Sequence, residues 1–129
     1  MDLRSLTHIP CAVLVVNRDL KPLYGSRKGF SVFGIRLRRE VSAETLQDLD
    51  RAIGQESAFL EQARGALVQV NRPGSEVQFQ WERGGRIYQV TVGVQERETV
   101  YALLFDDVTQ QTRFEETQEL ARRYLEDIL

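Results

Sequence analysis

Two adjacent glycines, Gly84 and Gly85, set the strand pairing of the C-terminal half of the chain. A glycine pair between alternating apolar segments is typical of a two-residue β-hairpin turn. Counting outward from this turn predicts a series of apolar cross-strand pairs: Trp81 with Tyr88, Phe79 with Val90, and Val77 with Val92. The positions between them carry glutamine and threonine, so one face of the hairpin is apolar and the other is polar. Such a hairpin belongs in an antiparallel sheet that is buried on one side.

A third strand extends the same face if the chain turns back at Glu96 and Arg97. This turn predicts a second series of pairs: Val92 with Tyr101, Val90 with Leu103, and Tyr88 with Phe105. A slip of one residue would mix apolar and polar side chains on both faces. The alternation therefore predicts three antiparallel strands with one shared apolar face.

The N-terminal part of the chain predicts two further strands and short helices. Residues 2–8 are predicted to form a short leading helix. The apolar, β-branched run at 11–16 is typical of a buried strand, and residues 21–24 follow as a second strand. Ser26 is suited to cap a short helix that Gly34 then ends.

Residues 42–69 have the spacing of amphipathic helices, with Ser42 as a cap, an interruption at Gly54 and turn residues at 71–74. The second helical segment has an apolar stripe made of Phe59, Leu60, Ala63 and Leu67. The element order predicts an α+β fold with a five-stranded antiparallel sheet. The helical crossover would cover one face of the sheet. The leading helix, the trailing helix or a second subunit would cover the other.

The chain is predicted to end in a helix over residues 108–129. Asp106, Asp107 and Thr109 place acidic and capping groups at its start, where free N–H groups and the helix dipole favour them. A heptad seam follows at Phe114, Thr117, Ala121, Tyr124 and Ile128, widened by Leu120 and Leu125. An exposed seam favours pairing with a second copy, and docking on the helix's own sheet is the alternative. No glycine or proline ends the helix, so we expect the natural chain to continue.

Composition limits the class of protein. A length of 129 residues suits a single domain with its own core. The formal net charge of -2 gives no broad positive field, so nucleic acid is not an expected partner. No apolar run approaches the roughly 20 residues of a membrane span, and a single cysteine, Cys11, excludes an internal disulfide. We therefore expect a soluble, cytoplasmic domain.

Several of these segments together resemble the PAS family of sensory domains. Residues 9–19 resemble the opening strand and turn of the family, and residues 33–34 resemble the end of its first short helix. Residues 82–88 resemble the hairpin before its penultimate strand. The Phe-Asp-Asp-Val-Thr segment at 105–109 matches the Asp-Ile/Val-Thr junction of the family, and residues 113–116 resemble the helix that follows. The similarity covers most of the chain and is most specific at the junction.

The resemblance implies a PAS-like sensory domain at residues 1–109 and a signalling or linker helix at residues 110–129. Asp107 and Thr109 would then join the last strand to the signalling helix, with Arg86 or a neighbouring basic residue as the expected partner of Asp107. The implied role is a non-catalytic sensor and homodimerisation module of a bacterial signal-transduction protein, with an output domain downstream in the same chain. A histidine kinase of a two-component system is the first expectation for that protein, and a diguanylate cyclase is the second.

The resemblance leaves the ligand and any cofactor unidentified. Haem-binding members use a histidine on the long helix, but the single histidine of this chain is His8. Photoactive flavin members use a cysteine early in the helical crossover, whereas Cys11 belongs to the first predicted strand. Histidine-ligated haem and covalent flavin are therefore disfavoured, and noncovalent flavin stays open. No metal site is expected, since His8 and Cys11 are too few ligands. The family often has asparagine after its second strand, near the position of Ser26.

The apolar face of the sheet is either the wall of a small-molecule pocket or a closed core, and aromatic faces more often simply pack. The candidate pocket residues are Phe33, Phe79, Trp81, Tyr88, Val90 and Tyr101. Two other classes of function stay open, a ligand-free dimerisation scaffold and a small pocket enzyme. An enzyme would need a converging acid and base, but Asp106 and Asp107 are neighbours on a strand and point to opposite faces.

Overall fold

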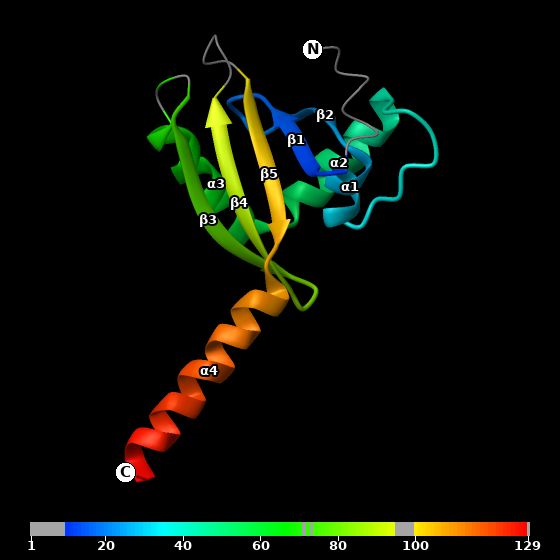
Figure 1. The fold of residues 1–129 in the computed structure, drawn as a ribbon. Helices are drawn as coiled ribbons and strands as arrows, with labels where there is room; N and C mark the ends of the chain where they lie inside the picture. Colours follow the sequence, from blue (N-terminus) through cyan, green and yellow to red (C-terminus); the bar gives the residue numbers. More distant parts are fainter. Residues whose placement is uncertain (1–9, 71, 73, 95–99, 129) are drawn as a thin grey trace.

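The protein folds around a five-stranded antiparallel sheet with the strand order β2-β1-β5-β4-β3 (Figure 1). The computed structural model describes residues 10–128 except 71, 73 and 95–99, so the predicted helix at 2–8 lies outside the described residues. The strands are β1 (Ala12–Val16), β2 (Pro22–Gly25), β3 (Glu76–Arg83), β4 (Arg86–Val94) and β5 (Tyr101–Asp107). The order places the first and last strands side by side at the centre. The predicted α+β fold class is confirmed.

The register of the β3–β4 hairpin is the one that the glycine pair predicts. Its cross-strand pairs include Trp81 with Tyr88, Phe79 with Val90, and Val77 with Val92. Gly84 and Gly85 both have positive φ angles, 58° and 78°, which a tight hairpin turn requires and which glycine adopts without strain.

The predicted pairing of β4 with β5 is wrong by two residues. The observed pairs include Val94 with Tyr101, Val92 with Leu103, and Val90 with Phe105. β4 ends at Val94 and β5 begins at Tyr101, so the connection is longer than a two-residue turn. The predicted turn at Glu96 and Arg97 itself lies outside the described residues. Because side chains alternate with a period of two, the shift leaves each side chain on its predicted face.

Three helices of the crossover cover one face of the sheet (Figure 1). They are α1 (Arg27–Val32), α2 (Ala43–Gly54) and α3 (Ser57–Gln69). Ser26 and Ser42 cap α1 and α2 as predicted, and Ser42 forms a capping box with Thr45. The expected helical crossover, with its break near Gly54, is confirmed.

Aromatic rings from the sheet and the crossover form one cluster in the core. The ring of Phe59 on α3 lies 5.4 Å from Phe33, 4.8 Å from Trp81 and 5.9 Å from Phe105. Tyr88 lies 5.9 Å from Trp81 on the neighbouring strand. The predicted apolar face of the sheet is therefore the face that packs against the helices.

The last helix, α4 (Thr109–Ile128), leaves the sheet and extends away from it (Figure 1). Its apolar side chains Phe114, Leu120, Tyr124 and Leu125 are between 58% and 68% exposed. The alternative in which this helix docks on its own sheet is not the arrangement observed.

Candidate functional site

The junction between β5 and α4 is fastened to the neighbouring strand β4 by hydrogen bonds. The backbone N–H of Ile87 donates to the hydroxyl oxygen of Thr109 at 2.7 Å, and the N–H of Val108 donates to the carbonyl of Ile87 at 2.9 Å. The N–H of Thr109 donates to Asp107 Oδ1 at 3.0 Å, and its hydroxyl donates to the same oxygen. The first residue of α4 therefore cannot move relative to β4 without breaking several bonds at once.

Arg86 lies beside Asp107, as the sequence predicts, with Nη1 3.3 Å from Oδ2. Both side chains are exposed to solvent, so this ion pair alone contributes little stability. The pKa of Asp107 lies below its ordinary value of 3.8. The main cause is the hydroxyl of Thr109, followed by the N–H of Thr109, and the charge of Arg86 acts in the same direction.

We expect the junction to loosen in acid because of this lowered pKa. A carboxyl group with a lowered pKa in the folded state contributes its stabilisation above its unfolded pKa and loses it as the pH falls through the folded value. The amide resonance of Thr109, which bonds directly to Asp107, should therefore stay constant above about pH 5 and titrate with a midpoint below 3.8. Two-dimensional NMR at a series of pH values measures this midpoint.

Asp107→Asn is the matched control for this titration, because it keeps the shape of the side chain and removes the ionisation. The acid transition of the Thr109 resonance should disappear in this variant. A midpoint at or above 3.8 in the unaltered protein would show that Thr109 does not stabilise the charged carboxylate.

Two contacts on either side of the β3–β4 turn were not foreseen from the sequence. Arg113, one turn into α4, donates from Nη2 to the backbone carbonyl of Gly85 at 2.9 Å. Arg83 donates from the other side of the same turn to Glu56 at 2.9 Å. No sequence pattern identifies the partner in a bond to a backbone carbonyl or in a contact across 27 positions. The only hint was the presence of Arg83 directly beside the tight turn.

Five of the six predicted pocket residues are buried in the core and Phe79 is partly buried against it, but the six do not all converge. Phe33 and Trp81 stack with centroids 5.2 Å apart, and Tyr88 adjoins them. Tyr101 begins β5 and pairs with Val94, so it lies at the end of the strand away from this cluster. The remaining two candidates are Phe79, which lies 6.0 Å from Phe59, and the fully buried Val90. The ring cluster is thus the part of the prediction that forms a single group.

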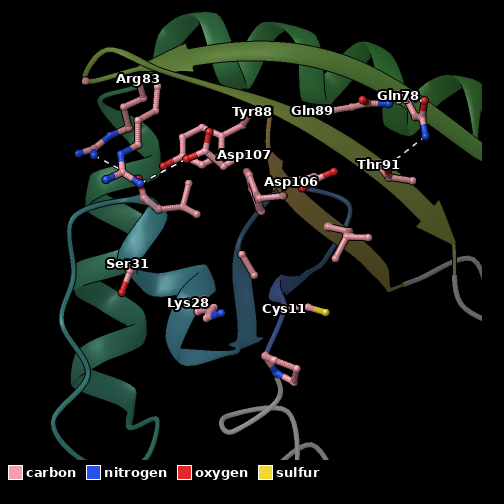
Figure 2. Close-up of a pocket in the computed structure, with 17 residues that line it drawn as sticks. Cys11, Lys28, Ser31, Gln78, Arg83, Tyr88, Gln89, Thr91, Asp106 and Asp107 are labelled. Carbon is pink, nitrogen blue, oxygen red and sulfur yellow. Dashed lines mark hydrogen bonds and ion pairs between the residues drawn. The ribbon is translucent and has the colours of Figure 1, made fainter. Parts of the chain in front are cut away.

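A surface groove of about 880 Å³ lies between α1, the start of β1 and the turn end of the β3–β4 hairpin, and it reaches the polar face of the sheet at Gln78, Gln89 and Thr91 (Figure 2). Lys28 and Ser31 of α1 line one side, and Arg83, Tyr88 and Asp107 line the other. Of the predicted pocket residues, Tyr88 is the one that reaches this groove. The groove therefore joins the edge of the aromatic cluster to the carboxylate of the junction.

Cys11 lies in the bend before β1 and is exposed, since the strand begins one residue later than predicted. His8 lies outside the described residues. Among the residues that the structure describes, no three His, Cys, Asp or Glu side chains gather as a metal site. In the same part of the chain, no helix combines the length and the apolar character needed to cross a bilayer.

The strand order, the helical crossover and the departing C-terminal helix define a PAS-like α+β fold. No family model matches the chain, and no curated protein matches it by sequence. Among solved structures, the chain is similar to the PAS domain of BvgS from Bordetella pertussis. The two are 14% identical, with a TM-score of 0.46, and the similarity covers 91% of this chain and 86% of that one.

Proposed function

We propose that this chain is a regulatory sensory and dimerisation module of a signal-transduction protein. It would couple the binding of a ligand or partner to an output domain through α4. The observation that carries this proposal is the junction, where Thr109 and Asp107 fasten the start of the outgoing helix to the sheet. The sensory domain would comprise residues 1–109 and the signalling helix residues 110–129.

The proposed mechanism is a shift between two arrangements of the sheet. A ligand or partner that packs better with one arrangement raises the population of that arrangement. Since Val108 and Thr109 are bonded to Ile87 on β4, a displacement of β4 relative to β5 reaches the first turn of α4 directly. The output domain would then respond to the changed position or pairing of this helix.

The side-chain pattern of α4 supports pairing with a second copy. The exposed seam residues Phe114, Ala121 and Tyr124 follow one side of the helix. The ion pairs of Arg122 and Arg123 with Glu119 and Glu126 lie at the positions that face solvent when such a seam is paired. Ile128, the last predicted seam position, has a side chain outside the described ones. We propose a homodimer joined along this seam.

We propose a cytoplasmic location for this domain. The parent protein proposed from the family resemblance is a histidine kinase of a two-component system, with a diguanylate cyclase as the second choice. The domain itself would be non-catalytic. Its ligand and any cofactor stay unidentified, and the aromatic cluster with the adjoining groove is the proposed place for a small molecule.

The test is to change both junction residues in the parent protein with Asp107→Ala and Thr109→Ala. We expect the ratio of output activity with and without the stimulus to fall about tenfold. The reason is that the side-chain bonds that fasten α4 to β4 disappear. The measurement is the activity of the output domain with and without the stimulus.

Glu116→Ala is the matched control, since Glu116 is an exposed carboxylate of α4 that lines neither the groove nor the predicted seam. It should leave the response unchanged. A parent protein whose output ignores the double junction variant would exclude the proposed coupling route.

A ligand-free dimerisation scaffold is the second candidate, and the close ring packing between Phe59 and Trp81, at 4.8 Å, favours it. Native mass spectrometry of freshly purified protein separates the two candidates. A bound small molecule supports the sensor, whereas a dimer of unmodified mass supports the scaffold.

A further inference from the structure

We infer that the turn of the β3–β4 hairpin mechanically couples the helical crossover to α4, with Arg83 as the positioning residue on the crossover side. Only the role of this coupling in signalling rests on the proposed function. The contacts themselves belong to the 129-residue chain and can be tested there.

Arg83 holds the ends of two helices at once. Its Nε donates to Glu56 Oε1 at 2.9 Å, and its Nη1 donates to the backbone carbonyl of Val32 at 3.1 Å. Glu56 is the N-cap residue of α3, and Val32 is the last residue of α1. One guanidinium therefore joins the end of α1 and the start of α3 to the final residue of β3.

The environment of Arg83 favours a well-defined contact. Its side chain is 33% exposed and that of Glu56 is 27% exposed, so the pair is more protected from solvent than the pair of Arg86 with Asp107. The guanidinium also lies over Gly34, where an added Cβ would come within 3.4 Å of Nη2. Gly34 has a φ of +79° and no side chain, which leaves room for the arginine.

The opposite side of the same turn holds α4. Arg86 is the cross-strand neighbour of Arg83 in the ladder, and its side chain donates a hydrogen bond to Asp107. The carbonyl of Gly85 accepts a hydrogen bond from Arg113 on α4. The segment from Arg83 to Arg86 thus contacts α1, α3 and α4 within a single tight turn. Figure 2 shows Arg83 and Asp107 on the same side of the groove, with α1 below them.

The consequence is a second route from the helical crossover to the outgoing helix, separate from the bonds of Thr109. A molecule in the groove between α1 and the hairpin would lie against Arg83 and could displace it from Glu56 or Val32. Because a two-residue turn has little freedom, movement of Arg83 would pass to Gly85 and Arg86.

Amide hydrogen exchange of the whole chain, followed by NMR, tests this route. Arg83→Gln should raise the exchange rate of the Val108 and Thr112 amides, at the start of α4, about fivefold, since a partly buried ion pair is lost. The amides of Leu14 and Val15, in the centre of the sheet, should change less than about twofold. Glu56→Gln, the milder variant, should give the same pattern.

The combined variant Arg83→Gln with Glu56→Gln should show little more than the effect of Arg83→Gln alone, because Glu56→Gln removes only the ion pair that Arg83→Gln already removes. Arg51→Gln is the control, since it removes an exposed ion pair with Asp48 on α2 and should change no amide of α4. A uniform rise at all amides, a rise confined to α1 and α3, or additive effects would each overturn the inference. These results need no output domain, so they are independent of whether the junction variants alter signalling in the parent protein.

Discussion

Replacing Phe59 with alanine is expected to lower the free energy of unfolding by about 3–5 kcal/mol. Phe59 is fully buried on α3, and its removal would leave a cavity that a packed core fills only partly. The neighbouring rings that would lose contacts are Phe33, Phe79, Trp81 and Phe105. Urea denaturation measures the loss, and the single tryptophan, Trp81, lies 4.8 Å from Phe59 and reports it by fluorescence.

Val68→Ala is the matched control, because Val68 lies on the same helix and is 81% exposed. It should change the free energy of unfolding by no more than about 0.5 kcal/mol. A loss below about 1 kcal/mol for Phe59→Ala would contradict a closed ring cluster. It would favour a cluster whose rings line a ligand site, and would therefore count against the scaffold alternative.

The contrast between the two hairpins shows what the sequence could predict. Gly84 and Gly85 have few alternatives to a tight turn, so they set the β3–β4 register to the residue. The segment after Val94 contains no glycine or proline to fix the length of the connection. Alternating apolar residues satisfy any even shift equally well, so they predicted the buried face of β5 and could not predict its partners.

The candidate site divides along the same line. Asp107 and Thr109 were predicted together because they lie in one recognisable junction segment, and Arg86 was added as a partner from the family resemblance. The structure places both Thr109 and Arg86 beside Asp107. Arg83 and Glu56 are 27 positions apart, and their meeting depends on how the crossover packs on the sheet. Local propensity carries no information on that packing. Contacts between side chains of separate layers can therefore be identified only from the folded structure.

Ser26→Ala is expected to lower the free energy of unfolding strongly, because Ser26 makes the contact between α1 and β1. Ser26 is fully buried, and its hydroxyl donates to the carbonyl of Cys11 at 2.7 Å. The same oxygen accepts from the N–H groups of Val13 at 2.9 Å and Gly29 at 3.1 Å. A Cβ on Gly29 would lie 2.4 Å from the carbonyl oxygen of Val13, so the start of α1 and strand β1 lie too close together for a side chain at position 29. Alanine would leave these backbone groups without their partner, and we expect a loss of about 2–4 kcal/mol.

Thermal and urea unfolding of Ser26→Ala measure this loss, and Ser31→Ala is the control on the same helix. Ser31 is exposed and its hydroxyl donates only to the carbonyl of Arg27, so its replacement should cost no more than about 0.5 kcal/mol. The backbone N–H of Ser26 also donates to the carbonyl of Val13 at 2.9 Å, and the alanine variant keeps that bond. A loss below about 1 kcal/mol would therefore show that this backbone bond holds α1 on β1 without the hydroxyl. The larger loss would show that the Ser26 hydroxyl makes the contact that holds the start of α1 on β1.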